Sequence, residues 1–583
     1  MKCMLRWPAD TAAAWRMVLA VSVAVSLAGC ASLTTPVPLD ASTATPQLQK
    51  CLNDYTALDA AVDAAGVRDA GAARVAGFAY LRADRFTASL QDRLVTTVGA
   101  SHSANRSANQ SASRTALLQR LVQLDLDARR FEIANLPAAV RTQWAHSENS
   151  NNGANSNNGA DSHNIAALLQ RLQSCATVLG AHDAASPLRM AALLPRLQVP
   201  DSYRTAYRAA GAYAITRYPF AAGVRKLEAE RAAVMASGAP PAAGTRRVRY
   251  TPVFTPVFTP VFTPVGAANP TNPANPINTL TPAQLRTLLT PPAGDPLQIP
   301  MPAPADLALL FAQFAPHFDI DLASDNDKPG ALAWKAGDVS LDTTAPTLYQ
   351  QVAHTRYGQH NLLQLVYTVW FAARPPAPGS TLDLLAGKLD GITWRVTLAP
   401  DGTPLVYDTM HPCGCYHMFF TTPSAQPKPA PQAGIEWAFV PHSLPALTAQ
   451  QRVLIRIAPN THYIDRVSVV ETGKDAAKDT ILTLATQDYH SLRSLPLDQS
   501  ATKILPAPPV AGYRSVFSPQ GFIDGTDRAE RFLFWPMGIA RAGSMRQWGH
   551  HATAFVGRRH FDDAALMQER FSFDARHFDK PLP

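Results

Sequence analysis

The residues best suited to chemistry lie in one short segment, 411–417, which reads HPCGCYH and holds His411, Cys413, Cys415 and His417. Two imidazoles and two sulfurs are the ligand types of a zinc or copper site. The two thiols could instead form a strained disulfide or a redox pair, because only one glycine separates them and the backbone must bend to join them. A third interpretation is structural, in which the cysteines pair elsewhere or pack in a core.

The spacing of these four side chains weighs against a ready-made metal site. In an extended strand all four would face one side, in a row with steps of roughly 6–7 Å, which is too spread for one tetrahedral ion. Pro412 and Gly414 favour a turn, which could gather them. His354 or His360, from the preceding strand region, could add ligands.

A second candidate site is the segment 535–559, which combines arginines with tryptophans and glycines. Arginine forks beside aromatic rings can hold phosphate, carboxylate or sugar. The anion-binding candidates are Arg541, Arg546, Arg558 and Arg559. The alternative is a basic surface segment that packs its tryptophans on a sheet.

The first thirty residues have the pattern of an export signal. A basic start precedes twelve uncharged residues, 17–28, which are too few to span a bilayer and have the length of a secretory h-region. The run ends in Leu27-Ala28-Gly29-Cys30, which resembles the lipobox of bacterial lipoproteins. The resemblance implies a signal peptide over 1–29 and acyl chains, palmitate among them, on Cys30. Ala31 in place of an aspartate implies the outer rather than the inner membrane, with the body facing the periplasm.

Four cysteines follow the lipobox, and pairing is the default in an oxidising compartment. They allow three connectivities, so Cys51, Cys175, Cys413 and Cys415 are all disulfide candidates. Cys51 and Cys175 both fall on apolar stripes of predicted helices. We therefore expect a disulfide between two helices; two small buried hydrophobic side chains are the alternative.

The chain divides by composition into successive regions. A tether over 30–46 precedes a helical domain over 47–236, in which apolar residues recur at spacings of three and four. Polar segments at 101–114 and 147–164 lack apolar anchors and predict disordered insertions. Residues 237–300 form a Pro-rich linker with TPVF repeats, in which proline excludes a helix or a central strand.

Residues 301–583 predict a β-rich domain with peripheral helices. Strands are expected at 318–322, 362–371, 392–398, 405–409, 436–440 and 453–457, and Pro400-Asp401-Gly402 predicts a hairpin between the third and fourth of these. Helices followed by an antiparallel sheet indicate an α+β fold.

The charge composition argues against one class of function, nucleic-acid binding. The net charge of +8 is spread over 583 residues without a dense basic stripe, so we expect no nucleic-acid partner. The segments LDGITWR (389–395), HPCGCYH and MRQWG (545–549) resemble large proteobacterial lipoproteins of no assigned activity, which implies no catalytic residue. We expect a membrane-anchored envelope lipoprotein, a binding or structural module for an envelope polymer or a protein. The alternative is a metal- or thiol-dependent periplasmic enzyme centred on residues 411–417.

Overall fold

The computed structural model describes residues 37–39, 43–92, 104–146, 160–237, 244–254, 279–377, 379–380, 383–471, 480–497 and 512–578. The leader, Cys30, most of the tether, residues 147–159 and the TPVF repeats beyond residue 254 lie outside the described residues. The signal peptide and the lipid site therefore stay predictions. Among the described residues, no helix combines the length and the apolar composition needed to cross a membrane.

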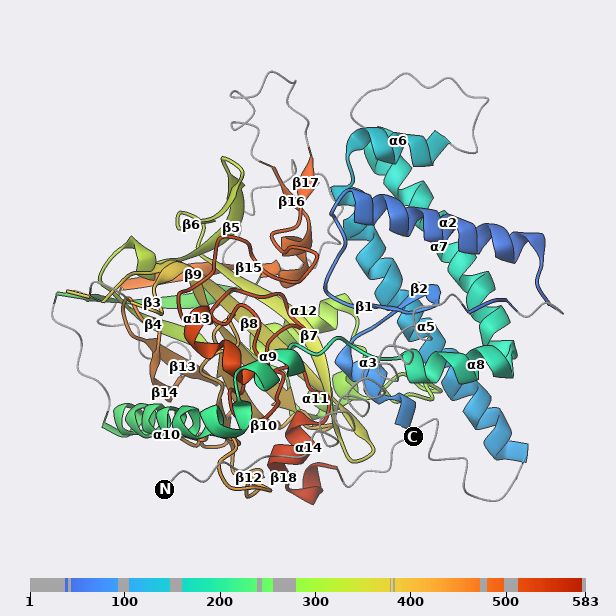
Figure 1. Cartoon of the computed structure of the whole chain (residues 1–583). Coiled ribbons are helices and arrows are strands. Elements are labelled where there is room, and N and C mark those ends of the chain that lie inside the picture. The colour runs from blue at the N-terminus through green and yellow to red at the C-terminus, as the bar shows by residue number, and fades with distance from the viewer. Residues whose placement is uncertain are drawn as a thin grey trace, which may run out of the picture.

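The N-terminal part forms a helical unit, which lies to one side of a large sheet (Figure 1). Its elements are α2 (Pro46–Ala64), β1 (Ala73–Val75), β2 (Phe78–Ala83), α3 (Arg85–Ser89), α5 (Ala104–Asn135), α6 (Ala138–His146), α7 (Ala160–Ala185), α8 (Pro187–Leu193) and η2 (Leu194–Arg196). Thr45 caps α2 by accepting a hydrogen bond from the Leu48 backbone N–H at 3.3 Å, and Pro46 occupies the first helical position. The apolar stripe of α2 is buried as predicted.

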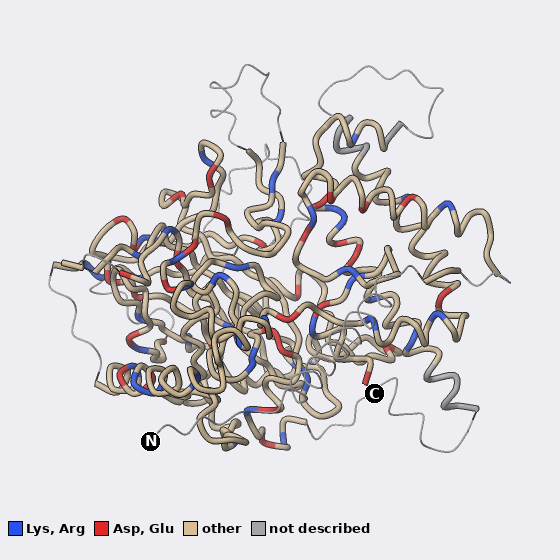
Figure 2. Tube along the Cα trace, viewed as in Figure 1, with Lys and Arg blue, Asp and Glu red and all other residues tan. Residues whose placement is uncertain are grey.

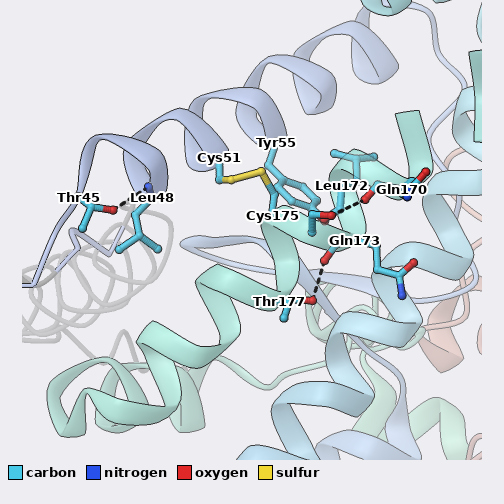
Figure 3. Close-up of a disulfide and its surroundings, with 10 residues drawn as sticks. Thr45, Leu48, Cys51, Tyr55, Gln170, Leu172, Gln173, Cys175 and Thr177 are labelled. Carbon is cyan, nitrogen blue, oxygen red and sulfur yellow. Dashed lines mark hydrogen bonds between the residues drawn. A yellow bond between two sulfur atoms is a disulfide. The ribbon is translucent and has the colours of Figure 1, made fainter. Parts of the chain in front are cut away.

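A disulfide joins α2 to α7, which confirms the expected pairing of Cys51 with Cys175 (Figure 3). Their Cα atoms lie 5.3 Å apart, and both side chains are buried. One turn further along α2, the Tyr55 hydroxyl donates a hydrogen bond to the Leu172 carbonyl at 3.0 Å. The two helices are thus held by a covalent, a polar and an apolar contact.

The polar segments expected to be disordered are partly helical. α5 begins at Ala104 and α7 at Ala160, so residues 104–114 and 160–164 extend long helices. The prediction was wrong there because a helix, once anchored by packing, gains one hydrogen bond for each added residue and needs no further apolar anchor. The hairpin of β1 and β2 was also missed.

The C-terminal part is built on a twelve-stranded sheet with the order β11-β10-β9-β8-β7-β15-β3-β4-β13-β14, to which β5 and β6 attach at β8. The strands are β3 (Arg246–Val253), β4 (His317–Leu322), β5 (Pro329–Lys335), β6 (Asp338–Asp342), β7 (Thr347–Tyr357), β8 (His360–Arg374), β9 (Gly387–Leu398), β10 (Pro404–Met410), β11 (Met418–Thr421), β13 (Gln451–Ile457), β14 (Ile464–Glu471) and β15 (Thr480–Asp488). The α+β class and the β9–β10 hairpin are confirmed. The sheet is mixed rather than antiparallel, because β15 runs parallel to β3 and β7, and β13 runs parallel to β4.

Smaller elements surround this sheet. The helices are α9 (Thr205–Ala210), α10 (Tyr213–Ser237), α11 (Pro282–Leu289), α12 (Pro304–Phe314), α13 (Arg531–Phe534) and α14 (Leu566–Arg570), with short 3-10 turns η3 (Asp325–Asp327), η4 (Tyr489–Arg493), η6 (Trp535–Met537) and η7 (Ala575–His577). Two short strand pairs are β12 (Ala425–Pro427) with β18 (Phe571–Phe573) and β16 (Leu495–Pro496) with β17 (Tyr513–Arg514). Residues 436–440, expected to be a strand, belong to no strand of the structure.

Strand β3 corrects the predicted linker, because it lies in the middle of the sheet although it ends inside the first TPVF repeat. Pro252 is tolerated because antiparallel pairing with β4 stops at Tyr250, so the missing proline N–H removes no bond on that side. Val248 and Tyr250 are buried in the core of the sheet. Residues 246–253 of the predicted linker are therefore part of the sheet.

The last two helices of the predicted helical domain belong to the sheet unit instead. The Arg204 backbone N–H donates to the Gly538 carbonyl at 2.8 Å, and the Arg208 guanidinium donates to the Met537 carbonyl at 2.8 Å. α10 packs on β14 and η6, on the opposite side of the molecule from α2 and α7 (Figure 1). The boundary at residue 236 was wrong because helical periodicity shows that a helix has an apolar face but not what covers it.

Candidate functional site

A cavity of about 510 Å³ lies between α10 and the end of the sheet that carries the 411–417 loop. From α10, Phe220, Gly223, Leu227 and Arg231 line it, at spacings of three and four that place them on one face of the helix. Most of the lining is apolar and includes Val224, Phe439, Leu533, Phe534 and Phe555. A concave, mainly apolar site with a few polar groups is the usual form of a small-molecule site.

The 411–417 loop is a tight turn that lies against this cavity. The Gly414 N–H donates to the His411 carbonyl at 2.7 Å, and the His411 N–H donates to the Cys415 carbonyl at 3.0 Å. Gly414 has φ +92°, and a Cβ there would lie 2.5 Å from the Ala552 carbonyl oxygen. Only glycine fits both conditions. The turn that Pro412 and Gly414 favour is therefore present, and both thiols and both imidazoles line the cavity.

His411 ends a buried chain of alternating imidazoles and carboxylates. Its Nδ1 lies 3.0 Å from Asp390 Oδ1, and Asp390 Oδ2 lies 3.0 Å from His462 Nδ1. His462 Nε2 in turn lies 3.3 Å from Asp327 Oδ1. All four residues are at most 3% exposed, and Arg528 places a guanidinium nitrogen 3.5 Å from Asp390.

The two histidines of this chain differ in charge state, because burial and hydrogen bonding act on them differently. Burial alone would raise the pKa of Asp390, but hydrogen bonds from His411 and His462 and the charge of Arg528 hold it well below its usual range. Burial would lower the pKa of His462, but hydrogen bonds to Asp327 and Asp390 raise it instead. Burial lowers the pKa of His411. A neutral His411 that donates from Nδ1 to Asp390 keeps an unprotonated Nε2, the arrangement of a general base.

Several residues in or next to this buried chain of imidazoles and carboxylates have strained backbone conformations. Leu389 has φ +56°, Tyr416 has φ +58° and His462 has φ +53°, which are left-handed conformations that these residue types rarely adopt. Leu389 directly precedes Asp390, and the Tyr416 hydroxyl accepts a hydrogen bond from the Tyr463 hydroxyl at 2.8 Å. Strained residues persist where the surroundings fix them, and such places are frequently functional.

His417 has a different role from His411. Its Nε2 lies 3.0 Å from Asp408 Oδ2 and its Nδ1 lies 3.1 Å from Thr553 Oγ1, so both nitrogens are used. Burial lowers the pKa of His417 to about 3. Arg395 also binds Asp408, with its Nε 2.9 Å from Oδ1. This cluster holds β9, β10 and the loop together and leaves His417 no free lone pair.

The two thiols of the loop are free and adjacent. Cys413 is buried and Cys415 is half-buried. A hydrogen bond from the Cys415 thiol lowers the pKa of Cys413, and the nearby charge of Arg528 acts in the same direction. Thiolate is the reactive form of cysteine, so Cys413 is the more reactive of the pair. The predicted Cys413–Cys415 disulfide is not formed in this structure.

Two carboxyl groups of the cavity wall titrate near neutrality. Burial raises the pKa of Glu436 to about 7, although its Oε1 accepts from the backbone N–H groups of Phe555 at 2.7 Å and Val556 at 2.8 Å. Burial also raises the pKa of Glu530 to about 7. Within the described part of the chain, Glu530 Oε1 is buried without a hydrogen-bond partner. Perturbed carboxyls in a cavity are candidates for proton transfer or for binding polar atoms of a ligand.

The predicted metal ligands do not gather around one point. His411 and His417 turn to different carboxylates, Asp390 and Asp408. In the described ranges, no group of three or more His, Cys, Asp or Glu side chains is placed to hold an ion. Zinc or copper binding by the loop stays a prediction from the sequence.

The four arginines expected to bind an anion are engaged within the protein. Arg541 pairs with Asp527 at 2.8 Å, and Arg558 pairs with Asp201. Arg546 is 1% exposed and donates to the carbonyls of Ala540 and Arg541. Arg559 is also buried and donates to Thr553 Oγ1 at 3.0 Å, although it reaches the cavity wall. Arg546 and Arg559 are used inside the protein because irregular loops leave carbonyls that need donors, and guanidinium forks supply them. Anion binding by the four arginines stays a prediction from the sequence.

Sequence reasoning missed Asp390, His462, Glu436, Glu530 and the whole of α10 as parts of the site. Asp390 lies in the LDGITWR segment, but no pattern in that segment assigns it a role. Its partners come from positions 21 and 72 residues away. The fold and the site together define an α+β protein with a ligand-sized cavity at one end of a mixed sheet. Comparison with known proteins adds no relative, since no family model, curated protein or solved structure matches the chain.

Proposed function

We propose that this chain is a lipid-anchored envelope protein that binds a small, largely apolar molecule in the cavity beneath α10. The observation that carries the binding function is the cavity itself, about 510 Å³ with a mainly apolar wall and a few buried polar groups. The anchor rests on the lipobox at Cys30 and on the export signal before it. Outer-membrane attachment with the body facing the periplasm, and contact with an envelope polymer or protein, belong to the same proposal.

The cavity is tested by filling it from α10. Gly223 lines the cavity, and a Cβ added there meets nothing within 4 Å. We expect Gly223→Leu to weaken saturable binding of the neutral probe N-phenyl-1-naphthylamine at least about tenfold, a loss of about 1.4 kcal/mol. The matched control is Gly180→Leu in α7, where an added Cβ also meets nothing within 4 Å but the position lies outside the cavity.

Both substitutions remove a helical glycine, so each should raise helix stability by roughly 0.5–1 kcal/mol and neither should impair folding. Probe binding that is equal in the two variants would contradict the cavity as the binding site. The anchor is tested separately by growing cells with a labelled fatty acid. Label must enter the wild-type chain and be absent from Cys30→Ala; equal labelling of both removes the anchor.

A thiol-dependent enzyme is the second candidate, favoured by one observation: Cys413, Cys415 and the His411 end of the buried chain line the same cavity. His411 would take the thiol proton, and the thiolate would attack an electrophilic carbon of the bound molecule. p-Nitrophenyl butyrate is a suitable probe. Release of p-nitrophenolate that Cys413→Ser abolishes and Gly180→Leu leaves intact would favour the enzyme over a pure binding module.

A further inference from the structure

The cavity beneath α10 holds one carboxyl group that no other residue of its surroundings satisfies. Glu530 directly precedes α13, lines the cavity and is 2% exposed. Its Oε1 is buried, and no hydrogen bond or ion pair joins its side chain to any residue that the structure describes. Gly543 lines the same cavity at φ +83°, and a Cβ added there would collide with this oxygen. The carboxyl group therefore occupies the space that the missing side chain of Gly543 leaves in the cavity wall.

This carboxyl group differs from the other buried ones that have an unsatisfied oxygen. Among the described residues, buried oxygens without a hydrogen-bond partner occur on three carboxylates, those of Asp59, Asp562 and Glu530. Asp59 still forms an ion pair with Arg129 at 2.6 Å, and Asp562 forms one with Arg85 at 3.4 Å. Glu530 has no such pair. A buried acceptor without a partner destabilises the protein, so a ligand group that donates to it is bound favourably.

The charged and imidazole donors of the cavity wall are already used. All three guanidinium nitrogens of Arg559 donate within the protein, and Arg231 lies 3.5 Å from Asp465. Both ring nitrogens of His417 have partners, and the free Nε2 of a neutral His411 is an acceptor. The strong polar groups left for a ligand are therefore acceptors, and the ligand must supply the donor.

The charges around Glu530 argue against a charged ligand group. Burial raises the pKa of Glu530 to about 7. Three guanidinium groups oppose this rise, those of Arg528, Arg374 and Arg546, and the Asp390 carboxylate adds to it. A ligand cation would be repelled by the three guanidinium groups, and a ligand anion by the two carboxylates. Over the rest of the molecule, basic and acidic residues are interspersed (Figure 2), so no field of one sign selects a charged molecule.

We infer that the molecule bound beneath α10 is an apolar alcohol, whose hydroxyl group binds the Glu530 carboxyl. A hydroxyl is uncharged, and it can donate to the ionised carboxyl and accept from the protonated one, so it suits a group that titrates near neutrality. The apolar body meets Phe220, Phe534 and Phe555, whose ring centroids lie 4.8–6.1 Å apart in the cavity wall. This ligand class rests on the binding function proposed above and adds the residue that selects the ligand.

The experiment measures displacement of N-phenyl-1-naphthylamine from the full mature chain by 1-decanol, its methyl ether, decylamine and decanoate. At pH 8 the amine and the carboxylate are charged, and the ether lacks only the hydroxyl donor. We expect decanol to bind at least about tenfold more tightly than either charged compound, because a charged group loses its hydration in a mainly apolar cavity. Equal or tighter binding of decylamine or decanoate would overturn the inferred ligand class.

Variants of Glu530 locate the hydroxyl contact. Glu530→Leu removes the acceptor and should weaken decanol binding at least about tenfold, while binding of the methyl ether changes less than about threefold. Glu530→Gln keeps an acceptor oxygen and the shape of the side chain, so decanol should still bind more tightly to it than to Glu530→Leu. The matched control is Glu230→Leu, also on the cavity side of the chain in α10 but outside the lining, where Glu230 forms only an exposed pair with Lys226 at 4.0 Å.

The control should change the affinity of neither compound. Equal weakening of decanol and the ether by Glu530→Leu would overturn the contact, because Glu530 would then act through the shape of the cavity. If Glu530→Leu does not fold, the order of the four compounds on the wild type and on Glu530→Gln decides instead. Failure of the naphthylamine probe to bind the wild type is a different result, since it removes the proposed binding function itself.

Discussion

Replacing Cys51 and Cys175 together by alanine removes the cross-link between α2 and α7, and its effect can be worked out from the length of chain that the disulfide closes. The two cysteines are 124 residues apart. For a loop of that length, loss of the cross-link returns about 5 kcal/mol of conformational entropy to the unfolded chain. The remaining contacts of α2, such as the Tyr55 hydrogen bond to the Leu172 carbonyl, do not depend on the sulfur atoms.

The expected result is therefore a large loss of stability without a change of fold. Urea unfolding should show it, and hydrogen exchange should place it in α2 and α7. The double variant Cys413→Ser/Cys415→Ser is the control, because its thiols are free and close no loop. A loss below about 1 kcal/mol, or equal acceleration of exchange in the strands of the sheet, would refute the reasoning, since a cross-link confined to the helical unit cannot act mainly elsewhere.

Three further predictions concern the loop and its buried chain. Asp390→Asn leaves His462 and Arg528 without their shared counter-charge and should lower the unfolding free energy by about 3–5 kcal/mol, measured in urea. Gly414→Ala forces a Cβ to within 2.5 Å of the Ala552 carbonyl at φ +92° and should cost at least about 1 kcal/mol in the same assay. Because the pKa of His462 is raised in the folded protein, its stabilising contribution is complete below about pH 6.5 and is lost as pH rises through the folded-state value. Urea unfolding from pH 6 to 9 should show this loss, and Asp327→Asn should reduce it.

Local patterns of the sequence predicted the elements whose stability is local. The Thr45 cap and the apolar stripe were enough to predict α2. In the same way, Asp401-Gly402 was enough to predict the turn between β9 and β10. The positions of Cys51 and Cys175 on the apolar stripes of two predicted helices also led to the correct prediction of their disulfide. In each case the deciding interaction either joins residues close together in the sequence or involves the apolar face of a helix, which the spacing of its residues reveals.

The buried chain ending at His411 could not be predicted in this way. Asp390 meets His462 only because β9 and the loop before β14 come together in the folded sheet. The same limit applies to the arginines. Arg546 and Arg541 are equally basic in sequence, yet Arg546 donates to loop carbonyls while Arg541 pairs with Asp527. Only the packing of distant segments decides which guanidinium groups bind loop carbonyls.

The sheet unit depends on chain that precedes its predicted boundary at residue 301. β3 lies between β15 and β4, so a fragment 301–583 would leave both strands without their shared neighbour, and it would also lack the α10 wall of the cavity. Fragment 201–583 restores both elements. We expect the longer fragment to fold with protected strand amides in hydrogen exchange and the shorter one to aggregate through its exposed strand edges. A soluble, protected fragment 301–583 would show that β3 is dispensable and that the sheet unit begins where its composition changes.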